Sequence, residues 1–131
     1  MGRYYSGDIE GKFWFGLQSS NDGEYFGAVE DSWTQYEVYP DSLEDEVIPG
    51  IEQCRKELGA WEKRLAKYFK ENNGYNPIAM AKELSNKHKQ NINEEELRDL
   101  LTVYARLGLG IQIRDWMVAN PGENLKFEAE S

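Results

Sequence analysis

The chemistry available to this 131-residue sequence comes mainly from its carboxylates. Asp8 and Glu10 are spaced to share one face of a strand. With Glu24 they offer the oxygen ligands that Mg²⁺ prefers, or an acid/base pair. The same Asp-x-Glu spacing beside glycine is also common in turns. One hypothesis is therefore a small-ligand-binding protein or metal-dependent enzyme, with a pocket between an N-terminal sheet and the long helix that follows.

Other residue types suited to catalysis are scarce. His88, the sole histidine, lies in Lys87-His88-Lys89, where positive neighbours disfavour its protonated form, and we expect an exposed loop residue. Cys54, the sole cysteine, falls in an apolar helical stripe and is expected to be a small buried hydrophobe. One Cys and one His cannot supply a Cys/His zinc site. We therefore favour a non-enzymatic role, with no catalytic residue, no metal and no cofactor.

The carboxylates are concentrated in the first part of the chain. Residues 1–50 hold two basic and eleven acidic residues, whereas residues 51–131 hold thirteen of each. Glu30 to Glu46 contains seven acids and no base, and helix-start chemistry around Ser42 accounts for part of them. This asymmetry indicates a partner with a basic surface. It argues against direct nucleic-acid binding, because counterion release requires Lys and Arg at the phosphates.

Residues 1–46 also hold ten of the seventeen aromatic residues, which can anchor an interface. We predict a partner-binding surface that combines these two residue types: Trp14, Glu30, Asp31, Trp33, Tyr36, Glu37, Asp41, Glu44, Asp45 and Glu46. This favours a small acidic interaction module, an inhibitor or adaptor for a basic protein such as one that binds nucleic acid. In general character, such a nucleic-acid mimic resembles phage-encoded inhibitors of nucleic-acid-processing host defences.

The first 46 residues are predicted to form an antiparallel β-meander. Alternating apolar residues predict a strand over 12–18, and the Asn, Asp and Gly of 19–23 favour a turn. Further strands are predicted over 24–29 and 33–39.

Three helices are predicted to follow the meander. Apolar residues recur at steps of three and four over 49–71, which predicts one amphipathic helix. Asn76 and Pro77 open a short helix that ends near Lys87. Asn93 opens a third helix through a capping box with Glu96, and Gly108 is expected to end it.

A C-terminal hairpin completes the predicted elements, with strands over 111–118 and around Leu125 and Phe127 and a frayed tail over 128–131. Three helices followed by a hairpin over 49–127 resemble a winged helix-turn-helix arrangement. In such domains the second helix of the pair reads DNA, but here that helix begins Asn93-Glu94-Glu95-Glu96. The resemblance therefore implies a scaffold or a protein-binding surface.

Length and composition predict a single α+β domain over residues 1–131. Its parts are an acidic, aromatic β-rich segment over 1–46 and a helical segment with the hairpin over 47–127. No apolar run approaches the roughly 20 residues that cross a bilayer, and the start lacks the apolar core of a secretory signal. We expect a cytoplasmic protein without membrane contact.

Overall fold

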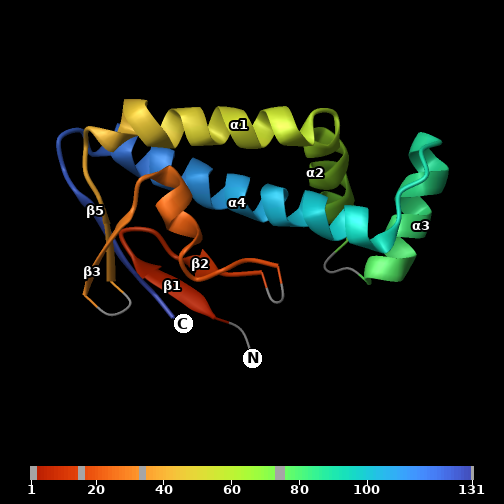
Figure 1. The fold of residues 1–131 in the computed structure, drawn as a ribbon, viewed down its shortest axis with the longest axis horizontal. Helices are drawn as coiled ribbons and strands as arrows, with labels where there is room; N and C mark the ends of the chain where they lie inside the picture. The colour runs from red at the N-terminus through yellow and green to blue at the C-terminus, as the bar shows by residue number, and fades with distance from the viewer. Residues whose placement is uncertain (1–2, 15–16, 33–34, 73–75, 131) are drawn as a thin grey trace.

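The computed structural model describes residues 3–14, 17–32, 35–72 and 76–130. A five-stranded antiparallel sheet packs against helices, which confirms the predicted α+β class (Figure 1). The strands are β1 (Tyr4–Gly7), β2 (Gly11–Lys12), β3 (Val29–Ser32), β4 (Gln35–Val38) and β5 (Leu125–Ala129). The helices are the 3₁₀ helix η1 (Asp22–Phe26), the π-helix η2 (Leu43–Val47), α1 (Ile48–Leu58), α2 (Trp61–Glu71), α3 (Pro77–His88) and α4 (Glu94–Ala119).

The C-terminal strand β5 forms the centre of the sheet, whose strand order is β2-β1-β5-β4-β3. Tyr5 of β1 lies opposite Ala129, and Tyr36 of β4 lies opposite Phe127. The prediction of a frayed tail from residue 128 is wrong, because Ala129 is 1% exposed and the Glu130 amide donates to the Tyr4 carbonyl at 2.9 Å. The two ends of the chain are thus held together in one sheet.

The predicted meander is not formed. Of its three strands, the third corresponds to β4, whereas most of the second is replaced by η1, which ends at the left-handed Gly27 (φ 87°). Of the described residues of the first, 12–14 and 17–18, Lys12 alone belongs to a strand, and the Leu17 and Gln18 amides turn back to the Trp14 carbonyl. Local alternation failed here because β4 and β1 both pair with the distant strand β5 and not with each other.

The predicted helix over 49–71 is two helices, α1 and α2. The break lies at Gly59, whose φ of 55° and ψ of −131° suit a residue without a Cβ. The apolar stripe nevertheless continues across the break, since Cys54 and Leu58 in α1 and Leu65 in α2 are all buried. Periodicity identified the buried face but not the turn in the chain.

The start of α3 confirms the prediction from sequence. The Asn76 side-chain oxygen accepts from the Ile78 and Ala79 amides at 3.0 and 3.2 Å, and Pro77 occupies the first turn. The predicted capping box of α4 is also present, with Asn93 and Glu96 bonding reciprocally.

The end of α4 differs from the prediction. The helix passes through Gly108 and continues to Ala119, so the strand predicted over 111–118 is wrong. Ile113 and Met117 are buried and continue the spacing of the preceding turns, because the helix keeps a packing partner along its length. No hairpin precedes β5 within the described residues, and the winged-helix resemblance is not confirmed.

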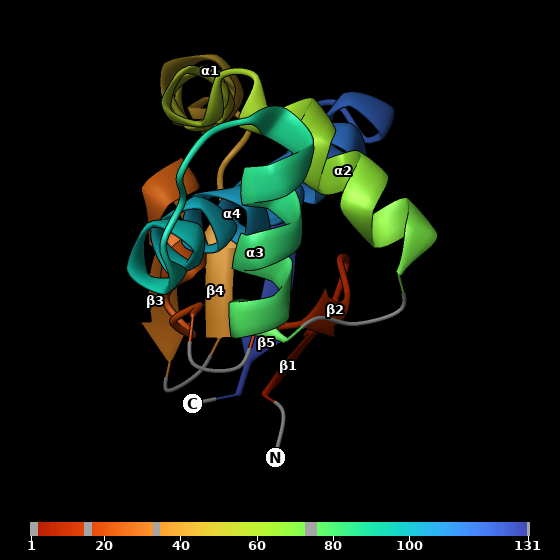
Figure 2. The same cartoon turned by 90° about the vertical axis from the view of Figure 1, so that its right-hand side faces the viewer.

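Helices α1 and α4 run side by side in opposite directions along the long axis of the molecule (Figure 1). The sheet lies near the C-terminal end of α4 and α3 lies near its N-terminal end, in front of α4 in the second view (Figure 2). Phe26 of η1 is fully buried between Gly50 of α1 and Gly110 of α4. Strand β3 of the acidic N-terminal segment and helix α3 therefore lie at opposite ends of the molecule (Figure 1).

Candidate functional site

The elements η1, β3 and η2 each carry exposed carboxylates, and contacts among η1, η2 and α1 hold the first and last of these elements together. No Lys, Arg or His occurs between Lys12 and Arg55, so these elements bring no positive charge of their own. Strand β3 is an edge strand, which leaves its outer side open. We define the acidic surface by the exposed carboxylates of these three elements: Glu24, Glu30, Asp31, Glu44, Asp45 and Glu46.

Two observations show that the three elements of the acidic surface lie close together. The pKa of Tyr36 is raised by burial and then by the negative charges of Glu30 and Glu24, so carboxylates from β3 and η1 act on the same phenol. The Glu46 carboxylate of η2 contacts the position where a side chain at Gly27 would begin. The charges of separate segments are therefore neighbours in space.

The acidic surface is not neutralised within the part of the chain that the structure describes. Residues 13–54 hold ten acids, and Asp22 is the one that forms an ion pair within 4.0 Å, to the Arg106 guanidinium at 2.8 Å. Asp22 is buried, and it also accepts from the Gln18 amide at 2.9 Å. The Asp22 carboxylate thus stabilises the fold. The helix dipole at the start of α1 stabilises the carboxylates of η2, which accounts for some of the other nine acids.

Two of the predicted aromatic anchors are packed inside the fold. Trp14 is half-buried against Phe69 of α2 and Tyr104 of α4, with ring centroids 5.3 and 6.1 Å apart. Tyr36 is 7% exposed and stacks on Phe127 at 5.6 Å. Trp33 lies outside the described residues. The Tyr36 ring is therefore buried in the fold, whereas the half-buried Trp14 also lines a cavity with residues of α2 and α4.

The other predicted site residues are divided between the surface and the fold. Asp41 is exposed just before η2, whereas Glu37 is half-buried and accepts from the Asn124 amide at 2.6 Å. Ser42 makes no side-chain cap, so the predicted capping box is not formed. Sequence reasoning missed two exposed apolar residues, Val29 and Tyr39, which are 51% and 47% exposed. The sequence feature that could have identified them is that each is an apolar residue close to acidic residues, Val29 at the start of β3 and Tyr39 just after β4.

The predicted metal or acid/base group is not assembled. Asp8 and Glu10 lie in the turn between β1 and β2 and not on a strand face, and Asp8 accepts from the Lys126 amide at 2.9 Å. Among the described residues, no three His, Cys, Asp or Glu side chains gather as metal ligands. Cys54 is buried as predicted, and burial raises its pKa to about 11, which keeps the thiol protonated.

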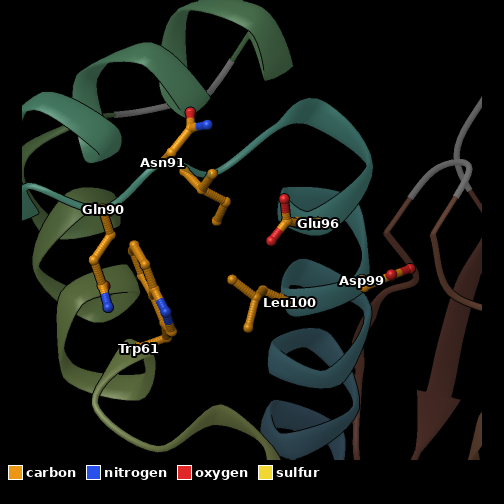
Figure 3. A pocket seen from close by; sticks show the side chains of 7 residues that line it. Trp61, Gln90, Asn91, Glu96, Asp99 and Leu100 are labelled. Atoms are coloured by element: carbon orange, nitrogen blue, oxygen red, sulfur yellow. The ribbon is translucent and has the colours of Figure 1, made fainter.

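The cavities lie beside the helices, and two of them are also lined by the N-terminal segment, one at Trp14 and one at Pro40 and Leu43. One of 350 Å³ is lined by the start of α2, the loop before α4 and the first turns of α4 (Figure 3). Figure 3 shows Gln90 beside the Trp61 ring, Leu100 facing that ring and the Asp99 carboxylate directed away from it. A cavity of 260 Å³ lies between Trp14 and residues of α2 and α4, on the helix side of the N-terminal segment. Asp8, Glu10 and Glu24, the polar residues predicted for a pocket there, do not line it.

Another cavity, of 210 Å³, lies between α2 and α3. His88 belongs to the last turn of α3 and is half-buried, which corrects its predicted place in an exposed loop. Its ring meets the Trp61 ring at 5.6 Å in an edge-on arrangement, and the Arg64 guanidinium lies 4.8 Å from the centroid of the same indole. Trp61 therefore lines the cavity of 350 Å³ and contacts two residues that line the cavity of 210 Å³.

Comparisons with protein-family models, curated proteins and solved structures give no match to this chain. Across the described ranges, no helix combines the length and the apolar character needed to cross a membrane. The assignment of a function therefore rests on the geometry and charge of the described residues.

Proposed function

We propose that this protein is a small interaction module that binds a basic protein through its acidic surface and acts as an inhibitor or adaptor. The observation that carries the proposal is the set of six exposed carboxylates without a cationic partner among the described residues. Folding alone does not call for such a set, because like charges repel and lower the stability of a compact state. A basic surface on a partner removes that repulsion on binding.

Charge of this kind acts mainly on the rate of association. Complementary fields steer two proteins together and can raise the association rate constant by about 10- to 1000-fold at low salt. Carboxylates on β3 and η2 present negative charge to a partner much as phosphates do, so a protein whose basic surface otherwise contacts nucleic acid fits best. The acidic surface then competes with nucleic acid for that partner.

Short-range contacts come from apolar side chains beside the acids. Val29 begins β3, directly before Glu30, and Tyr39 follows β4 two residues before Asp41. Both side chains are about half exposed and can contact a partner, whereas Tyr36 is buried. A ring and an aliphatic group among charges supply the desolvated contacts that hold a complex after encounter.

The test is affinity capture from the source cells, at low and at high salt, with three forms of the protein. The surface variant carries Glu30→Gln, Asp31→Asn, Glu44→Gln and Asp45→Asn. The control removes four exposed carboxylates elsewhere, through Glu10→Gln, Glu57→Gln, Glu71→Gln and Asp99→Asn. We expect the parent and the control to retain the same basic protein at low salt and the surface variant to lose it.

Two outcomes contradict the proposal. Equal capture by the surface variant shows that these carboxylates do not bind the partner. Equal loss from the surface variant and the control shows that net charge matters and that its position does not. Circular dichroism of both variants verifies the fold, since all eight positions are exposed.

A further inference from the structure

A groove between α2 and α3 is lined by basic residues. Helix α3 lies at the opposite end of the molecule from strand β3 (Figure 1). Four Lys or Arg side chains and two Glu side chains line it, so its net charge is +2 with the histidine neutral, on a chain of net charge −9. The charged and titratable lining residues are Lys63, Arg64, Lys67, Glu71, Glu83, Lys87 and His88. Such a concentration of cations is costly unless an anion occupies it.

The lysines of the groove are available to a ligand. Glu83 precedes Lys87 by one helical turn, and Lys67 precedes Glu71 by the same spacing, which favours pairing along each helix. Within the described residues, however, no carboxylate lies within 4.0 Å of Lys63, Lys67 or Lys87. All three are exposed, so their ammonium groups can turn toward an anion.

Arg64 is held in place before any ligand arrives. Its guanidinium donates to the Gln90 side-chain oxygen at 2.6 Å and lies over the Trp61 ring at 4.8 Å. The same ring contacts His88, so Arg64 and His88, which both line the groove, share one indole as a packing partner. A guanidinium that is already oriented loses little entropy on binding an oxyanion.

The positive charges converge on one point. The pKa of His88 is lowered by burial and then by the charges of Arg64, Lys87 and Lys67. Two of these cations come from α2 and one from α3, so the field at the imidazole has sources on both sides of the groove. An anion placed there interacts with all of them together.

We propose that this groove binds a phosphate group. A phosphomonoester carries a charge of about −1.5 to −2 at neutral pH, which matches the net charge of the lining. Guanidinium and ammonium groups are the usual donors to phosphate oxygens. Tyr68, which is half-buried, also lines the groove and offers an apolar ring surface to the carbon part of an ester. The site is separate from the acidic surface and does not rest on the function proposed for it.

The test is an NMR titration of the full chain with inorganic phosphate and with phenyl phosphate, at constant ionic strength set by sodium chloride. Because His88 is the sole histidine, its ring proton reports on the groove without overlap. We expect saturable shifts at His88, with a dissociation constant of about 1 mM or below. Tighter binding of phenyl phosphate assigns the site to an organic phosphomonoester, and equal binding assigns it to free phosphate.

Matched lysine variants separate a built site from general charge attraction. Lys67→Gln with Lys87→Gln is expected to weaken phosphate binding by about tenfold or more, which corresponds to roughly 1.4 kcal/mol. Lys56→Gln with Lys70→Gln removes the same charge from exposed positions outside the groove and should change the affinity by less than about twofold. Equal weakening in the two variants, or the same shifts with chloride alone, overturns the proposal.

Discussion

The ring of Phe26 lies so close to the backbone of Gly110 that a Cβ at position 110 would stand 2.4 Å from the ring Cζ atom. Phe26 is fully buried in η1, and Gly110 lies within α4. Gly50 of α1 meets the same ring, where a Cβ would be 2.9 Å from Cδ1. One aromatic side chain of the acidic segment thus joins it to both long helices through two glycines.

We expect Gly110→Ala to destabilise the protein by roughly 1–3 kcal/mol, because the added methyl group overpacks a core that cannot shift freely. Gly108→Ala is the matched control two residues earlier in α4. A Cβ at position 108 meets nothing within 4 Å, so this change should stabilise the helix by roughly 0.5–1 kcal/mol. Urea unfolding measures both. A gain in stability from both substitutions would contradict the packing described for Phe26.

The Asp22–Arg106 ion pair should contribute more to stability than any carboxylate of the acidic surface. Asp22→Ala removes the acceptor of Arg106 and of Gln18 in a buried position, and we expect a loss of about 3 kcal/mol. Asp22→Asn keeps the shape without the charge and should cost about half as much. Asp31→Asn, at an exposed position, should stay within about 0.5 kcal/mol of the parent. Equal effects at positions 22 and 31 in thermal unfolding would refute this order.

Cys54 should make folding sensitive to alkaline pH. Burial raises its pKa from 9.0 to about 11, so the unfolded thiol ionises first and stability falls as the pH rises from 9 toward 11. Cys54→Ala should remove this part of the decline, whereas the buried tyrosines still contribute above pH 10. Urea unfolding at several pH values measures the slope. At pH 8 a disulfide reagent should label the native thiol far more slowly than the unfolded one, and fast native labelling would contradict the burial.

The pKa of His88 should rise when neighbouring cations are removed. It is lowered from 6.5 by burial and by Arg64, Lys87 and Lys67, so the unfolded chain takes up the proton first and stability falls as the pH drops below 6.5. The carboxylates that line the same groove are Glu71 and Glu83.

Lys67→Gln and Lys87→Gln should each move the His88 pKa toward 6.5, and Lys70→Gln, which does not line the groove, should leave it unchanged. The measurement is the pH titration of the histidine ring proton by NMR. An unchanged pKa in both lysine variants would show that burial and Arg64 account for the lowered value, and that Lys67 and Lys87 do not act on the imidazole.

Local sequence determined the features that depend on neighbouring residues. The caps at Asn76 and Asn93 set the starts of α3 and α4, because each uses side chains within three residues of the amides they bind. Helical spacing placed Cys54 in the core, and the surplus of acids in residues 13–54 is a property of composition. The acidic character of one end of the molecule was therefore readable without a structure.

Tertiary structure decided the rest, because the responsible partners are distant in sequence. Strand β5 enters the sheet between β1 and β4, a pairing that no local alternation reports. Gly108, which was expected to end α4, lies within the helix, and so does Gly110, against which the distant Phe26 packs. Arg106 neutralises Asp22, which lies 84 residues earlier in the chain. The packing of α4 against the acidic segment therefore decides which carboxylates remain available to a partner.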